Sequence, residues 1–132
     1  MTVERDRILN RIATIGAEIA LGVKNHLLSD RDMVSHFGAT PDVVHTIWFV
    51  LHQDPARFKI PTDGIELTHV LWALHFSKNY AKKKAIRKQY GVSYKTFNKY
   101  ELPIRHAMGK LVKEIVSNFV VCLLLLIKPN NY

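Results

Sequence analysis

The chain has 132 residues, with 19 basic and 11 acidic side chains and a formal net charge of +8 at pH 7. This length predicts one domain, because two hydrophobic cores would each have too few residues. Leu, Ile, Val and Phe make up about a third of the chain, well above the roughly one-fifth typical of disordered sequences. The only cysteine, Cys122, excludes an intrachain disulfide and a cysteine-rich zinc site. The basic balance favours a polyanionic partner such as nucleic acid or an anionic membrane surface.

The first predicted helix covers residues 3–24, where isoleucine recurs at spacings of four, three and four residues. Charged residues fall between the isoleucines, and Gly22 is a natural stop signal. We therefore assign residues 1–29 to an N-terminal amphipathic helix.

Two shorter helices are predicted next. Asp30 is expected to cap a helix that ends near His36, with Gly38 as its stop. Thr40 followed by Pro41 is a strong start signal for a second helix, which should continue to about Leu51.

Residues 54–64 contain two prolines and a glycine, which indicates a loop. The following segment, 66–80, is predicted to be a helix with apolar side chains around most of its surface. A helix of that kind is usually buried, so we expect it to form the centre of the core.

The last predicted helices are a basic one at 81–90, one that Ser93 caps, and one at 104–127. Pro103 is expected to end or kink the helix before it. Because no segment alternates with the period of a strand, the predicted fold is all-α. We expect a compact multi-helix domain, 1–132, with a homeodomain-like helix-turn-helix unit. Within it, 30–113 would be a tandem helix-turn-helix-like core and 114–132 an apolar C-terminal helix or tail.

The positive charge is concentrated in residues 78–113. This segment has a single acid, Glu101, whereas the rest of the chain is slightly acidic. Such segregation is typical of a surface that contacts a phosphate backbone. A solvated helix face would give the same composition, so charge alone does not decide between the two. The basic residues of the segment are Lys78, Lys82, Lys83, Lys84, Arg87, Lys88, Lys95, Lys99, Arg105, Lys110 and Lys113.

The same segment matches the residue pattern of a helix-turn-helix. That motif needs buried apolar residues on both helices, a glycine with positive φ in the turn, and a residue that caps the second helix. Arg87 stands where a small residue usually lets the helices approach, so we expect a wider crossing or an outward Arg87. All other positions have suitable residues, namely Ile86, Tyr90, Gly91, Val92, Ser93, Phe97 and Tyr100.

The first turns of the second helix have side chains suited to a DNA major groove. Lysine reaches guanine O6 and N7 there, and asparagine pairs with adenine. Hydroxyl groups and a helix N-terminus bind phosphate. The predicted groove residues are Ser93, Tyr94, Lys95, Thr96, Asn98 and Lys99. The predicted phosphate contacts come from the preceding helix and are Lys82, Lys83, Lys84, Arg87 and Lys88.

A similar pattern occurs 53 residues earlier, at Phe37, Gly38, Ala39, Thr40, Val44 and Ile47. The second helix of that unit has no lysine or arginine on its predicted outer face, and Asp42 would repel phosphate. We interpret it as a structural unit that packs against the other.

Three blocks of the sequence resemble the N-terminal helical region of DDE transposases of the PIF/Harbinger type. They are Phe-Gly-Ala-Thr-Pro-Asp-Val-Val at 37–44 with Ile-Trp at 47–48, Leu-Trp-Ala-Leu-His-Phe-Ser-Lys-Asn-Tyr at 71–80, and Gly-Val-Ser-Tyr-Lys-Thr-Phe-Asn-Lys at 91–99. The resemblance extends over 37–112 and implies a helical DNA-binding segment that precedes an RNase-H-like catalytic domain.

Strand cleavage by that catalytic domain requires three carboxylates on a sheet that hold divalent metals. After Glu101 the only acid is Glu114, so the resemblance implies DNA binding without nuclease activity. We expect no enzyme activity, no catalytic residue and no cofactor. The resemblance also implies double-stranded DNA as the partner, the nucleus as the location (otherwise the cytoplasm), and an origin as a truncated or domesticated transposase or a shortened gene model.

Other sites are less well supported by the sequence. The seven histidines include no pair four residues apart and no His-Glu-x-x-His motif, so we expect no metal site. Residues 119–127 are all apolar, but a membrane span needs about 20 such residues, so we expect no membrane insertion.

Two alternatives to DNA binding are left open. The 111–127 surface either packs on the core or is a protein-interaction surface for a homo-oligomer or a partner helix, which is the main alternative. RNA binding shares the charge argument but lacks interleaved aromatic residues on which bases could stack.

Overall fold

The computed structural model describes residues 2–61, 63–79 and 83–127, and these residues form helices and connecting turns without a strand. The all-α prediction is confirmed. The helices are α1 (Thr2–Leu21), α2 (Asp30–Phe37), α3 (Pro41–Gln53), α4 (Leu67–Asn79), α5 (Lys83–Tyr90) and α6 (Tyr94–Ile127).

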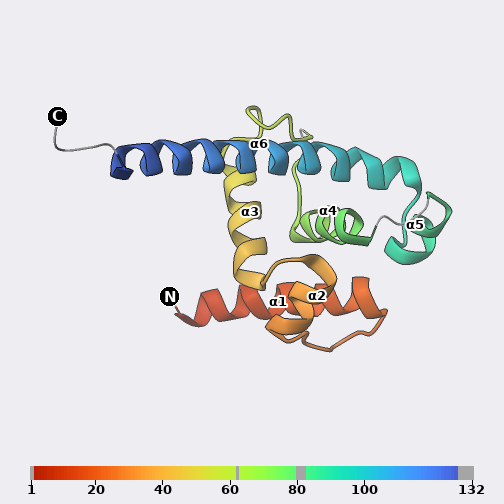
Figure 1. Cartoon of the computed structure of the whole chain (residues 1–132). Helices are drawn as coiled ribbons and strands as arrows, with labels where there is room; N and C mark the ends of the chain where they lie inside the picture. Colours follow the sequence, from red (N-terminus) through yellow and green to blue (C-terminus); the bar gives the residue numbers. More distant parts are fainter. Residues whose placement is uncertain (1, 62, 80–82, 128–132) are drawn as a thin grey trace, which may run out of the picture.

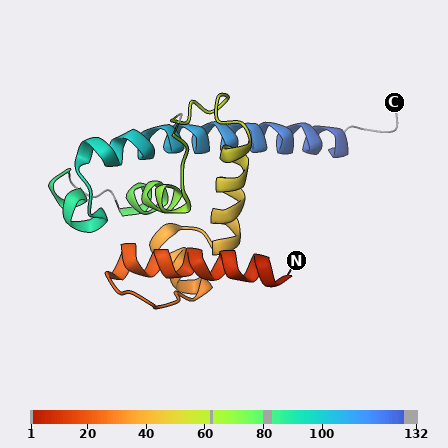
Figure 2. The ribbon, with the colours of Figure 1, turned by 180° about the vertical axis from the view of Figure 1, so that it is seen from behind.

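Two long helices, α1 and α6, run along opposite sides of the molecule, and α3 stands between them (Figures 1 and 2). Helix α4 lies beside α3 and contacts α1, α2, α3 and α6. Six of its thirteen residues are buried. The helix predicted to be the centre of the core is therefore confirmed in that position.

The start of α2 differs from the prediction. Ser29, not Asp30, is the N-cap, because Ser29 has the extended backbone and its hydroxyl accepts a hydrogen bond from the Asp32 N–H. Gly38 ends α2 with a φ of 74°, a conformation that glycine adopts without a steric penalty. Helix α3 begins at Thr40 and Pro41 as predicted.

Pro103 was predicted to end or kink a helix. It does not end one, because α6 continues past Pro103 to Ile127 (Figure 1). Proline in a helix interior removes one hydrogen bond and costs about 3 kcal/mol. Residues on both sides of Pro103 are buried on one helix face, including Phe97, Ile104 and Ala107. Packing of this face against α4 stabilises a single helix despite the local signal.

The inward positions predicted for both two-helix units are buried or half-buried. Ile86, Tyr90 and Phe97 are buried, and Val92 and Tyr100 pack against the core from its edge. In the earlier unit, Phe37, Ala39 and Val44 are buried and Ile47 packs against them. Both units contact α4, and α3 also contacts α6 directly.

Candidate nucleic-acid interface

The turn between α5 and α6 is built from two local features. Gly91 has a φ of 73°, and its N–H donates to the Arg87 carbonyl at 2.9 Å. The Ser93 hydroxyl accepts a hydrogen bond from the Thr96 N–H at 3.2 Å, which caps α6. These features orient the start of α6 as the sequence predicts, while the assignment of the pair as a DNA-binding helix-turn-helix stays a prediction.

The predicted groove residues lie at the surface of the molecule. Asn98 is half-buried, and Tyr94 is 38% exposed. The exposed members are Ser93, Tyr94, Lys95, Thr96 and Lys99.

The predicted phosphate contacts are described only in part. Arg87 and Lys88 are exposed. Of the two expectations for Arg87, a wider helix crossing or an outward side chain, the exposure agrees with the outward side chain. Lys82 lies outside the described residues, and so do the side chains of Lys83 and Lys84.

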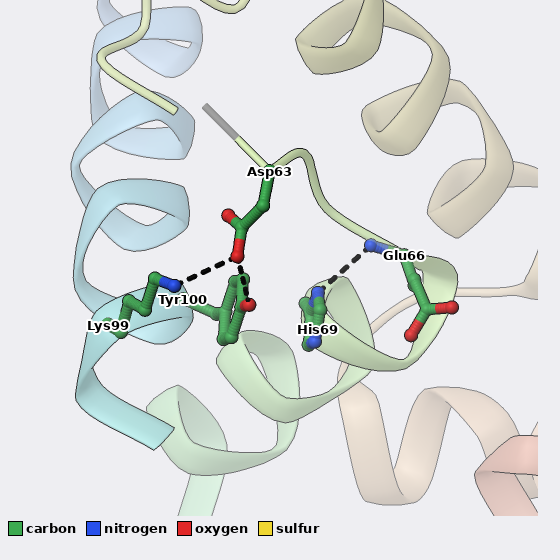
Figure 3. Close-up of polar contacts among 5 residues, drawn as sticks. All are labelled: Asp63, Glu66, His69, Lys99 and Tyr100. Carbon is green, nitrogen blue, oxygen red and sulfur yellow. Dashed lines mark hydrogen bonds and ion pairs between the residues drawn. The ribbon is translucent and has the colours of Figure 1, made fainter. Parts of the chain in front are cut away.

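An acid that no sequence pattern pointed to contacts the start of α6. The Asp63 carboxylate accepts hydrogen bonds from Lys99 Nζ at 2.8 Å and from the Tyr100 hydroxyl at 2.9 Å (Figure 3). The hydrogen bond from Lys99 and then that from Tyr100 hold the pKa of Asp63 below its usual value. The same hydrogen bond from Lys99 raises the pKa of its ammonium group. Lys99 is therefore a predicted groove residue that already has an acidic partner within the protein.

His69 connects this cluster to the start of α4. Its ring stacks on Tyr100 with the centroids 3.8 Å apart, and its Nδ1 accepts a hydrogen bond from the Glu66 N–H (Figure 3). Burial lowers the pKa of His69, because removal from water disfavours the charged imidazolium. A neutral His69 is also what the hydrogen bond requires, since a protonated Nδ1 could not accept it. The stack positions the first turns of α6 against α4.

A second buried pair lies beneath the α5–α6 turn. His75 Nδ1 and the Tyr90 hydroxyl are 2.7 Å apart, and the Tyr90 ring stacks on Phe97. Burial lowers the pKa of His75 and raises that of Tyr90, so both groups are neutral at pH 7. The two buried polar groups hydrogen-bond to each other. Because both are neutral, they add no charge to the region beneath the turn.

The single acid of the basic segment points into the molecule. Glu101 is 1% exposed, and its carboxylate accepts hydrogen bonds from Arg105 Nε at 2.8 Å and from the Arg105 guanidinium at 3.3 Å. Arg105 therefore compensates Glu101 within the protein. Because Glu101 is buried, its negative charge does not neutralise the exposed lysines of the basic segment.

Other candidate sites have little support in the described residues. No three His, Cys, Asp or Glu side chains gather where they could hold a metal ion, within the part of the chain that the structure describes. Across the same residues, every helix is too short or too polar to cross a membrane. The C-terminal end of α6 exposes Leu124, Leu125 and Leu126, which are 59%, 68% and 81% accessible.

Comparison of the chain with protein-family models, curated proteins and solved structures finds no match. The function is therefore inferred from the side chains and contacts of this surface.

Proposed function

We propose that the protein binds double-stranded DNA through the surface formed by α5, the Gly91 turn and the first turns of α6. The observation that carries the proposal is the separation of charge within the basic segment. Lys95, Lys99 and Arg87 are exposed near the turn, whereas Glu101 is buried against Arg105. Asp63 pairs with Lys99 at this surface, but the exposed cations outnumber that carboxylate, and such a surface attracts a phosphate backbone.

The residues then divide into two roles. The N-terminal turns of α6 enter the major groove, where Lys95 donates to guanine O6 and N7 and Asn98 pairs with adenine. Ser93, Tyr94, Thr96 and Lys99 contact base edges or phosphates. The basic helix α5 crosses the backbone, with phosphate contacts from the exposed Arg87 and Lys88. The contacts predicted from the sequence at Lys82, Lys83 and Lys84 stay part of the proposal.

The proposed activity is binding without strand cleavage. It agrees with the resemblance of 37–112 to the helical segment of PIF/Harbinger transposases, and the protein would act as a transposase-derived DNA-binding module. Such a module is not an enzyme and functions where duplex DNA is present, in the nucleus.

Lys95→Ala tests this proposal directly. We expect it to weaken binding to a duplex by about 1–3 kcal/mol, because Lys95 is exposed at the start of α6 and would contact a base edge. The measurement is a fluorescence-anisotropy titration against duplex DNA, single-stranded DNA and RNA at two salt concentrations.

The control is Lys24→Ala, which removes an exposed lysine from the turn after α1 and should leave affinity unchanged. Binding that does not weaken with salt, equal loss in both variants, or a preference for RNA over duplex DNA would overturn the proposal.

The exposed leucines at the end of α6 favour a second candidate function. A run of exposed Leu124, Leu125 and Leu126 is unusual on a monomer surface, because large apolar patches generally mark contacts with other molecules. In this alternative, 111–127 associates with a second copy or a partner helix, and the basic face only keeps the protein in solution.

A further inference from the structure

We infer that the bound duplex contacts α6 at two places, at Lys95 and Lys99 near its start and at Lys110 and Lys113 farther along. This inference rests on the proposed DNA-binding function. It adds a second phosphate-contact site at Lys110 and Lys113, two residues of the basic segment to which no specific contact has been assigned above.

Helix geometry places all four lysines on one side of α6. Lys95 and Lys113 are 18 residues apart, which is about five turns of 3.6 residues, so they share one direction around the axis. Lys99 and Lys110 are 11 residues apart, or about three turns. Helix α6 is continuous from Tyr94 to Ile127, so one helix carries all four lysines.

The lysine face lies on the side of α6 opposite its contact with α4, and Lys99 at the edge of this face pairs with Asp63 of the loop before α4. Phe97, Ile104 and Ala107 are buried on the opposite side of α6, where the helix contacts α4. All four lysines are exposed.

Nearby carboxylates do little to neutralise the second lysine pair. Among the described residues, neither Lys110 nor Lys113 forms an ion pair, although Glu114 is close in sequence. Glu114 is instead paired with Arg57 of the loop that follows α3. The ammonium groups of Lys110 and Lys113 are therefore available to an external anion.

The distance along α6 between the two lysine pairs is somewhat larger than the width of one major groove. From Lys99 to Lys110 the helix rises about 16 Å, and the major groove is about 12 Å wide. When the first pair lies at the groove, the second pair therefore lies over the phosphate backbone that borders it. The face between the pairs has no lysine or arginine, since Leu102, Pro103, His106 and Gly109 occupy it.

The test is the double variant Lys110→Ala/Lys113→Ala in the full chain, titrated with several duplex sequences over a range of salt concentrations. Each lost phosphate contact should make the slope of log K against log salt less negative by about 0.9, so we expect a change of about 1.8. The loss of affinity should be similar for all sequences, because phosphate contacts do not distinguish bases.

Two further variants control for charge and for folding. Lys24→Ala/Arg31→Ala removes two exposed cations from the α1–α2 side of the molecule, opposite α6, and should leave the slope unchanged (Figure 1). Lys110→Arg/Lys113→Arg keeps both charges and should keep the slope.

The outcomes separate this inference from the proposed function. If Lys95→Ala weakens binding while the Lys110→Ala/Lys113→Ala slope stays at the wild-type value, the second contact does not exist and DNA binding stands. If neither variant differs from its control, both are overturned.

Discussion

Asp63 partly neutralises Lys99, the lysine that shares its helix face with Lys95. The carboxylate and the ammonium group are about half exposed and 2.8 Å apart, and Tyr100 donates to the same carboxylate oxygen. An exposed ion pair of this kind contributes little to stability, so a phosphate can compete for the lysine. In the proposed complex, Lys99 exchanges the Asp63 carboxylate for a DNA phosphate, and Asp63 then repels that phosphate.

Asp63→Asn should therefore tighten duplex binding, by at most about fivefold. The asparagine oxygen still accepts a hydrogen bond from Tyr100, but it carries no negative charge to hold Lys99 or repel DNA. Anisotropy titrations at low salt would measure the change.

A suitable control is Asp32→Asn, which removes the same charge from exposed α2 and should have a smaller effect. Equal tightening in both variants would show that only net charge matters, and weaker binding of Asp63→Asn would contradict a competing role for Asp63.

At the scale of helices, α6 combines an unfavourable interior proline with favourable packing. Pro103 lacks the N–H that would donate to the Lys99 carbonyl, which is four residues earlier. The buried face that includes Phe97, Ile104 and Ala107 keeps the helix continuous across that defect. Packing therefore outweighs a local cost of about 3 kcal/mol.

Pro103→Ala should raise the free energy of unfolding by about 1–3 kcal/mol, because alanine restores the hydrogen bond and has a higher helix propensity. Urea denaturation followed by far-UV circular dichroism would measure this change.

Gly109→Ala is the matched variant, since Gly109 is exposed on α6 and a Cβ there meets no atom within 4 Å. It should stabilise the protein by only about 1 kcal/mol, the propensity difference alone. A destabilised Pro103→Ala variant would indicate that contacts of the proline ring outweigh the missing hydrogen bond.

At the scale of the whole molecule, the basic surface and the exposed leucines occupy different parts of α6. The predicted groove residues are at its start, and Leu124, Leu125 and Leu126 are near its other end (Figure 1). Between them, Leu111 packs against the core and Glu114 pairs with Arg57. The two candidate functions can therefore be separated by shortening the chain.

A chain that ends at Val116 should bind duplex DNA with an affinity close to that of the full chain, because it keeps the basic residues and these core contacts. Any self-association through Leu124, Leu125 and Leu126 should be lost, because the shortened chain lacks these residues. Sedimentation velocity and a duplex titration, with circular dichroism to verify folding, would measure both properties.

A folded, shortened protein that no longer binds DNA would contradict the first proposal and favour the interaction module. Loss of self-association with DNA binding retained would show that the two surfaces work independently.

Most of the secondary structure is predictable from short-range signals. Gly91 with Ser93, and Thr40 with Pro41, mark helix ends through interactions within a few residues. The apolar spacing that identified Ile86, Tyr90 and Phe97 as inward residues works for the same reason, since helix periodicity alone decides which residues share a face. The all-α class and the exposure of Lys95 follow from these local patterns.

The contacts that tune the surface depend on residues far apart in the chain. Asp63 meets Lys99 only because α4 brings the preceding loop against α6, and neither residue has a local pattern that predicts the other. Glu101 has its Arg105 partner one helical turn away, yet its burial follows from the packing of α6 on α4. The same packing keeps α6 continuous across Pro103, because the free energy of a buried face depends on the elements that cover it.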